Sequence, residues 1–417
     1  MVQSNMLNNP KLSVSQEPPY DVLQAFVREN HVAISGSGEG PLKGMVFAAK
    51  DVFKILGSTV GNGHPEWLRT HEPDDFTSSI ILRLLEAGAD LVGKTVADEL
   101  CYSISGENWN YGSPINPHDS RRYTGGSSAG SAAATAGGLV DFALGSDCLG
   151  SVRVPSGYNG ILGMRPTFHR VPSDGEVPYC ESFDMPGFMA ASPEIFKKVA
   201  EVLLGADEKP AKVKRLLIAR DCFEAVNQDV AEALKPAVSY LGENLEEVRE
   251  VTVSKEGLSE WAETFRIIQG YEVWKSYGGW VRKYQPHLNR GPKERLEWAS
   301  TVTMSQYKEA YAKRKDIIAQ VGELVADGGV ICLPTAASVA PLRTASLEEI
   351  NATRLQSTYL TCISPLTETP QINLPMVKQY EVPLGLGIIG EWGTDRAMTD
   401  FAVDMVSGFA KDKNERE

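Results

Sequence analysis

Two serines and one lysine are the residues of this chain whose types and spacing best suit chemistry. Ser127 lies in TGGSSAGS (124–131), and Ser151 lies in GSDCLGSVRVPS (145–156). Lys50 ends the apolar stretch MVFAAK. A serine attacks a carbonyl carbon when a nearby base removes its proton, and a lysine is that base in some hydrolases. The three segments therefore predict a serine hydrolase with a lysine base.

The surroundings of Lys50 fit that role. A lysine must be neutral to accept a proton, and burial favours its neutral form. The apolar run before Lys50 predicts a short buried strand that ends at the lysine. None of the six histidines lies in the three segments: they are His31, His64, His71, His118, His169 and His287. A lysine base is therefore the simpler interpretation.

Together these segments resemble the amidase signature family, serine amidohydrolases that use a Ser–cis-Ser–Lys triad. The resemblance covers roughly residues 43–200 and more weakly 328–405, and it is nearest to the plant-type indole-3-acetamide amidohydrolases. It implies that Ser151 is the nucleophile, that Ser127 relays its proton and that Lys50 is the base. It also implies a cis peptide bond between Gly126 and Ser127, so Gly126 is expected to support the site.

The turn before Ser151 is expected to form the oxyanion hole, because the family places backbone N–H donors there. The donors in this chain would be the N–H groups of Cys148, Leu149, Gly150 and Ser151. The family has glycine where this chain has Leu149. We expect Leu149 to keep an ordinary φ and to face the pocket, since a left-handed leucine would cost about 1–2 kcal/mol. Cys148 is a rival nucleophile that would leave the serine and lysine pattern unexplained.

Several neighbours are expected to support the site or to bind substrate. Asp147 and Arg153 flank the nucleophile among apolar residues, and buried charges must be paired, so we expect them to form a buried ion pair. The loop over 105–126 is rich in Gly, Asn, Pro and Ser. It and the residues before it supply the candidates for substrate binding: Leu100, Cys101, Tyr102 and Trp109. The alternative is that these aromatic side chains only anchor the loop.

Composition limits the classes of function. The chain has 417 residues, of which 42% are hydrophobic and 23% charged, and these proportions are ordinary for a soluble enzyme. A net charge of −13 disfavours nucleic acid and anionic membranes as partners. The N-terminus has no secretory pattern, so we expect a cytoplasmic protein. The six cysteines lack metal-ligand spacing. We expect a small-molecule amide substrate, no metal and no cofactor, and a homodimer stays open.

Alternating strand and helix patterns predict an α/β fold with one large mixed sheet flanked by helices. We expect a single domain over 1–417, with a polar lead-in at 1–20 and a mostly helical substrate-side insertion at 206–330. Strands are expected at 44–50, 90–95, 141–147, 215–219, 328–337, 369–377 and 382–390, and a further buried element is expected at 159–167. Helices are expected at 21–30, 76–89, from Ser128 onward, 229–249, 257–284, 302–326 and 394–410, with a charged tail after the last.

These observations predict an amidohydrolase. The resemblance implies a primary arylacetamide such as indole-3-acetamide as substrate, with ammonia as a product. One alternative is a urea-like or carbamate-type small amide, which several arginines in the pocket would favour. A second alternative is a non-catalytic binding or docking module on the same fold, which loss of a triad residue would favour. All three triad residues are present.

Overall fold

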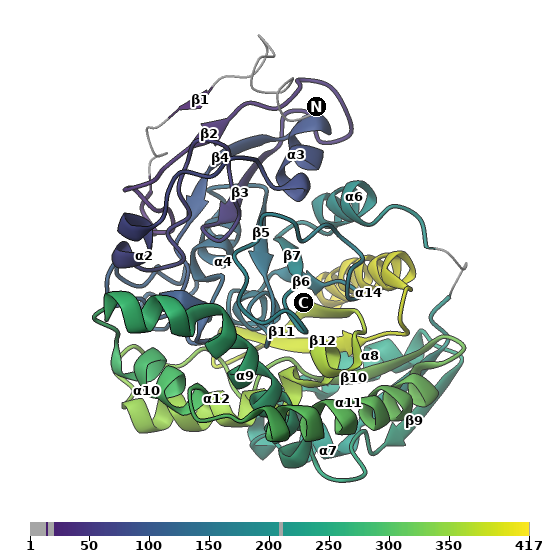
Figure 1. Cartoon of the computed structure of the whole chain (residues 1–417). Helices are drawn as coiled ribbons and strands as arrows, with labels where there is room; N and C mark the ends of the chain where they lie inside the picture. The colour runs from purple at the N-terminus through teal and green to yellow at the C-terminus, as the bar shows by residue number, and fades with distance from the viewer. Residues whose placement is uncertain (1–13, 16–20, 208–211, 417) are drawn as a thin grey trace.

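A computed structural model of the chain describes residues 14–15, 21–207 and 212–416. Its core is one twelve-stranded sheet in the order β1-β2-β4-β3-β5-β7-β6-β11-β12-β10-β8-β9 (Figure 1). Strands from both halves of the chain join it, and the expected mixed α/β fold is confirmed. The strands are β1 (Val14–Ser15), β2 (Ala33–Ile34), β3 (Val46–Lys50), β4 (Asp90–Thr95), β5 (Phe142–Ser146), β6 (Leu162–Arg165), β7 (Pro186–Ala190), β8 (Arg215–Ala219), β9 (Glu247–Val251), β10 (Gly329–Pro334), β11 (Gln371–Gln379) and β12 (Val382–Ile389).

Helices flank this sheet. Those that pack on α9 gather in the lower part of the view in Figure 1, on the side of the chain's second half. The helices are α2 (Pro65–Thr70), α3 (Ser79–Glu86), the 3-10 helix η1 (Glu99–Cys101), α4 (Ala129–Ala136), α5 (Arg153–Tyr158), α6 (Pro193–Leu204), α7 (Arg220–Glu224), α8 (Gln228–Glu243), α9 (Leu258–Tyr284), α10 (Arg290–Ala299), α11 (Met304–Val325), α12 (Leu347–Thr361), α13 (Ile363–Thr367) and α14 (Asp395–Arg416). No helix within the described ranges is both long and apolar enough to cross a bilayer.

Two neighbouring parallel strands place Lys50 and the turn that carries Ser151 at one edge of the sheet. β3 pairs in parallel with β5, with Ala49 opposite Leu144. β3 ends at Lys50, and β5 ends at Ser146, five residues before Ser151 in the printed sequence. Because parallel strands run in the same direction, their carboxyl ends lie side by side. The sheet therefore brings the lysine next to the turn that carries Ser151.

The small-residue helix α4 places Ser127 between them. Its residues are buried except the last, and it packs on β3 and β5. A Cβ atom on Gly130 would lie 2.2 Å from the Ala25 carbonyl oxygen, so only glycine fits this close approach. The Ser131 hydroxyl is hydrogen-bonded to Thr95 on β4 (2.7 Å) and to the Leu144 carbonyl on β5 (2.8 Å). These contacts fix the start of α4 over the strand ends.

Some expected elements differ. No helix forms at 21–30, because the Asp21 carboxylate accepts the backbone N–H groups of Ala25 and Phe26 (both 2.9 Å) and so replaces the hydrogen bonds of a helix. The helix expected to reach residue 249 ends at Glu243, and the chain continues as the edge strand β9. The last helix runs on through the charged tail to Arg416. The 206–330 region contributes β8, β9 and the first residues of β10 to the sheet as well as helices. Of the lead-in at 1–20, only Val14–Ser15 lies among the described residues.

Candidate active site

Lys50, Ser127 and Ser151 line one buried cavity at the carboxyl ends of β3 and β5. A hydrogen bond of 2.8 Å joins Lys50 Nζ to Ser127 Oγ, and Nζ also lies 3.5 Å from the Ser146 carbonyl oxygen. The three side chains are nearly inaccessible to solvent, with exposures of 1%, 1% and 4%. The Ser128 N–H donates to the Ser151 carbonyl at 3.2 Å and so ties the two serine segments together. Two serine hydroxyls and one amine thus line the same cavity.

Gly126 and Asp98 hold Ser127 in place. The Gly126–Ser127 peptide bond is cis, as the resemblance implied. The Asp98 N–H donates to the Ser127 carbonyl at 3.0 Å. A Cβ atom on Gly126 would lie 2.3 Å from both carboxylate oxygens of Asp98, so no other residue fits at this position. Burial raises the pKa of Asp98 to about 7, and the Gly106 N–H, which donates to its Oδ2, partly opposes this shift.

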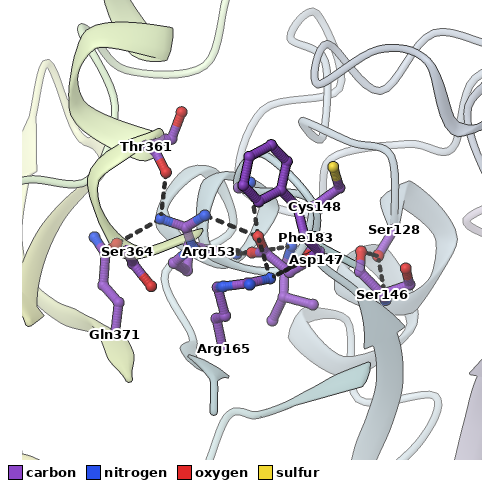
Figure 2. Close-up of polar contacts among 12 residues, drawn as sticks. Ser128, Ser146, Asp147, Cys148, Arg153, Arg165, Phe183, Thr361, Ser364 and Gln371 are labelled. Carbon is purple, nitrogen blue, oxygen red and sulfur yellow. Dashed lines mark hydrogen bonds and ion pairs between the residues drawn. The ribbon is translucent and has the colours of Figure 1, made fainter. Parts of the chain in front are cut away.

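Asp147 and Arg153 form a fully buried ion pair beside the nucleophile turn (Figure 2). Arg153 donates from Nη2 to Asp147 Oδ1 at 2.8 Å and from Nε to Oδ2 at 3.0 Å. Nη1 of the same guanidinium donates to the Thr361 carbonyl at 3.0 Å and to the Gln371 side chain. Burial alone would raise the pKa of Asp147, but the charges of Arg153 and Arg165 hold it well below its usual range. The pair links the turn to the second half of the chain.

The Asp147 carboxylate also shapes the expected oxyanion turn. It accepts the N–H groups of Gly150 (2.8 Å) and Val152 (3.0 Å). The Gly150 N–H is therefore occupied, which corrects the expectation that it faces an oxyanion. No hydrogen bond within the described residues engages the N–H groups of Cys148, Leu149 or Ser151. Gly150 has φ of +115°, and a Cβ there would lie 2.9 Å from Thr361, so only glycine fits.

Leu149 and Cys148 lie at the junction of two cavities. Leu149 is outside the left-handed region of φ and lines an outer cavity that Ser151 also lines. Cys148 is 5% exposed, its Sγ accepts from Gln269 Nε2 at 3.5 Å, and burial raises the pKa of its thiol. A thiol with a raised pKa forms little thiolate, which argues against Cys148 as a rival nucleophile.

The outer cavity is the candidate substrate pocket. It shares Cys101, Cys148, Ser151 and Tyr179 with the inner cavity. The two have volumes of about 20 and 10 Å³, room for roughly one water molecule each, so a substrate must displace side chains to enter. Hollows of about 690 and 870 Å³ lie elsewhere, and no triad residue lines them. The outer cavity is lined by Cys101, Tyr102, Ser103, Ile104, Cys148, Leu149, Ser151, Tyr179, Gln269 and Arg354.

Two of the four residues expected to bind substrate do not lie at the outer cavity. Cys101 and Tyr102 line the outer cavity, but Leu100 and Trp109 do not. Leu100 is fully buried in the main hydrophobic core. Trp109 lies in a surface loop and is 67% exposed. Neither side chain borders the space next to Ser151, so the expectation for these two residues was wrong.

Sequence reasoning missed the residues that the second half of the chain contributes. Gln269 on α9 and Arg354 on α12 line the outer cavity, and Tyr277 on α9 lines the inner one. Tyr277 belongs to an aromatic-rich stretch over 261–284, a composition that is typical of helix core as well as of a pocket. These residues lie more than 100 positions after Ser151, and no local spacing connects them to it. The glutamine and the arginine had no signal in the sequence.

Glu176 places a carboxyl group beside the lysine. It lines the inner cavity, and its backbone forms an isolated bridge with Phe53, three residues after Lys50 in the printed sequence. Its Oε2 atom is buried and has no hydrogen-bond partner among the described residues. Burial raises the pKa of Glu176 to about 7, while the Ser146 side chain and the Lys50 charge oppose that shift. The described residues contain no cluster of three or more His, Cys, Asp or Glu side chains arranged to hold a metal ion.

Comparisons with known proteins agree with this arrangement. The family model described as Amidase matches residues 21–256. Amidase 1 of Arabidopsis thaliana is 31% identical, over 92% of this chain and 98% of that protein. The chloroplastic outer envelope protein 64 of the same plant is 32% identical, over 86% of this chain but 66% of that longer protein. A solved structure titled as that of an amidase superposes with a TM-score of 0.78 at 27% identity, covering 90% of this chain and 86% of that one.

Proposed function

Because the chain belongs to the amidase family, and is thus a hydrolase acting on carbon–nitrogen bonds, we propose that it cleaves a small amide through an acyl-enzyme on Ser151. The observation that carries this proposal is the 2.8 Å hydrogen bond between Lys50 and Ser127 in the cavity that Ser151 also lines. A buried amine, a relay hydroxyl and a nucleophile are the groups that amide cleavage by a serine requires.

The reaction proceeds in two halves. Ser151 Oγ attacks the amide carbon while its proton passes through the Ser127 hydroxyl to the Lys50 amine. The N–H groups of Cys148, Leu149 and Ser151 are the donors available to the oxyanion. The carbon–nitrogen bond then breaks as the proton returns from Lys50 through Ser127 to the leaving nitrogen. Water, deprotonated by the same path, attacks the acyl-enzyme, releases the carboxylic acid and restores Ser151.

Two substrate classes compete. Similarity to the plant-type enzymes supports a primary arylacetamide such as indole-3-acetamide, which would release ammonia. Arg354 in the outer cavity favours the other class, a urea-like or carbamate-type small amide, because a cation there suits a polar or anionic substrate. Gln269, which also lines that cavity, adds an amide group that suits a polar substrate.

A docking module is the candidate from a different class. Its support is the 32% identity to outer envelope protein 64, whose name places that relative at an envelope membrane. The intact set of Lys50, Ser127 and Ser151 favours catalysis instead. A cytoplasmic location and action on a free small molecule go with the catalytic proposal, and a homodimer is compatible with it.

The test is ammonia release by the purified full chain across aliphatic, aromatic and ureido primary amides. We expect at least one amide class to be hydrolysed by the native protein and none by Ser151→Ala. Absence of ammonia from every amide, with a folded native protein, would favour the docking module.

A further inference from the structure

Two arginines beside the outer cavity lack a charge partner. Arg354 on α12 lines the cavity, and the Arg295 guanidinium on α10 lies 5.5 Å from the ring centroid of Tyr102, which also lines it. Across the described residues, neither guanidinium makes a hydrogen bond or an ion pair with another side chain. The Nε atom of each is buried without any partner. These two groups are therefore partly desolvated and uncompensated.

Their neighbours do not neutralise them. Burial and, after it, the positive charge of Arg354 together lower the pKa of Arg295 to about 10, so the two cations lie close enough to repel. Burial also lowers the pKa of Arg354. The same burial raises the pKa of the Tyr102 and Tyr179 hydroxyls, which therefore stay protonated and uncharged at neutral pH. The Asp98 carboxyl acts on Arg295 only through its field, and no carboxylate of the described residues contacts either guanidinium.

The fully buried arginines of the described residues have carboxylate partners, whereas Arg295 and Arg354 are only partly buried. Arg153 is paired with Asp147 at 2.8 Å, and Arg314 with Glu368 at 3.0 Å. The sequence has 54 acidic residues against 41 lysines and arginines, so acidic side chains are not scarce. Buried charges are normally paired, because an unpaired one loses its hydration without compensation. Arg354 and Arg295 are partly buried neighbours that make no ion pair among the described residues, and Arg354 shares a cavity with Ser151.

We propose that Arg354 and Arg295 form a carboxylate subsite, so that the substrate is the monoamide of a short dicarboxylic acid. This inference rests on the proposed amidase function and names its substrate class. A guanidinium binds a carboxylate through two parallel N–H···O bonds, which fixes orientation as well as position. Arg354 and Ser151 line the same small cavity, so a substrate held at its carboxylate end would present its amide carbon to Ser151.

Binding to Ser151→Ala protein measures the subsite without requiring catalysis. The probes are succinamate and butyramide, two short primary amides in which succinamate has a carboxylate where butyramide has a methyl group. Their binding is measured by titration calorimetry at pH 7. We expect succinamate to bind about 10-fold or more tightly than butyramide, the difference that hydrogen bonds to a charged group supply. Adding Arg354→Gln should abolish that difference.

Arg266→Gln is the matched control. Arg266 on α9 is near enough to influence Arg354 electrostatically, but it stacks on Trp298 and does not line the cavity. The Arg266→Gln variant should keep the preference for succinamate. Arg295→Gln is the second test variant, and we expect it to weaken the binding of succinamate but not of butyramide. Equal affinities for the two amides, or a preference that survives both Arg354→Gln and Arg295→Gln, would overturn the subsite.

Ammonia release by the native enzyme separates this proposal from the preceding one. Ammonia release from succinamate with a kcat/KM well above the values for butyramide and phenylacetamide supports both the amidase function and the carboxylate subsite. If phenylacetamide is hydrolysed and succinamate is not preferred in either assay, the subsite fails while the amidase function stands. If no amide is hydrolysed but Ser151→Ala protein prefers succinamate, the subsite stands and the catalytic proposal fails.

Discussion

Lys50 Nζ and Ser127 Oγ lie 2.8 Å apart although 77 residues separate them in the chain. Two features of the fold produce this contact. β3 ends at the lysine, and α4, whose close packing depends on Gly130, begins just after the serine. The contact is buried on all sides, so a proton can pass between the two groups without exchange with bulk water. The proposed mechanism depends on this relationship.

Replacing Lys50 should remove activity and spare the fold. Lys50→Met is expected to lower kcat by several powers of ten, because no other amine lines the inner cavity. Lys94 supplies the comparison: it is equally buried but is paired with Asp51 at 3.1 Å. Lys94→Met should cost roughly 3–5 kcal/mol of unfolding free energy, because it leaves Asp51 buried and unpaired. Steady-state kinetics measures kcat and urea unfolding measures the free energy of unfolding, each for both variants. The opposite pattern, in which Lys50→Met unfolds the protein, would make Lys50 a structural residue.

Arg153 should be essential for stability. Arg153→Met leaves the Asp147 carboxylate buried without its main partner and should lower the free energy of unfolding by about 3–5 kcal/mol. Arg121→Met is the control, because Arg121 pairs with Asp119 at the surface and is expected to change stability little. Similar unfolding midpoints for the two variants would contradict the structural role of the buried pair.

Leu149 should control substrate range. Since its φ is ordinary and its side chain lines the outer cavity, Leu149→Gly should widen the range of amides hydrolysed. Because Leu149 is buried in the main core, loss of its side chain should lower the free energy of unfolding by roughly 2–5 kcal/mol, and the added freedom of the unfolded chain by about 0.5–1 kcal/mol more. Gly150→Ala, one residue away, should instead abolish activity, because Gly150 needs a positive φ and has no space for a Cβ. An unchanged substrate profile in Leu149→Gly would contradict this assignment.

Asp98 should make stability depend on pH. Burial raises the pKa of Asp98 to about 7, above the ordinary aspartate pKa near 4. The stabilisation that this shift adds to the folded state is therefore fully present below pH 4 and is lost as pH rises through 7. Relative to Asp98→Asn, the native protein should therefore lose stability between about pH 4 and 7, by up to roughly 1.4 kcal/mol per pH unit. Urea unfolding across this range provides the measurement.

The control for that titration is Asp119→Asn. Hydrogen bonding to Arg121 lowers the pKa of Asp119 to about 2. The substitution Asp119→Asn should therefore not change how the free energy of unfolding varies between pH 4 and 7. Parallel stability profiles for the native protein and Asp98→Asn would show that Asp98 stays ionised.

The residues near the two serine segments could be predicted because their signals are local. Lys50 follows an apolar run, and Asp147 and Arg153 lie within a few residues of the nucleophile among small and apolar neighbours. Arg354 could not be predicted, since it reaches the cavity through the packing of α12 on α9 and no sequence spacing encodes that contact. The expectation for Trp109 was wrong because an aromatic residue in a polar loop has no sequence feature that distinguishes a pocket wall from an exposed surface.

The central claim is that Ser151 is the covalent nucleophile, and peptide-mapped mass spectrometry after treatment with a fluorophosphonate tests it most directly. The account predicts one adduct, on Ser151, that is absent from Ser151→Ala and forms far more slowly in Lys50→Met. An adduct on Ser127 or Cys148 in the native protein, or full amide hydrolysis by Ser151→Ala, would contradict it.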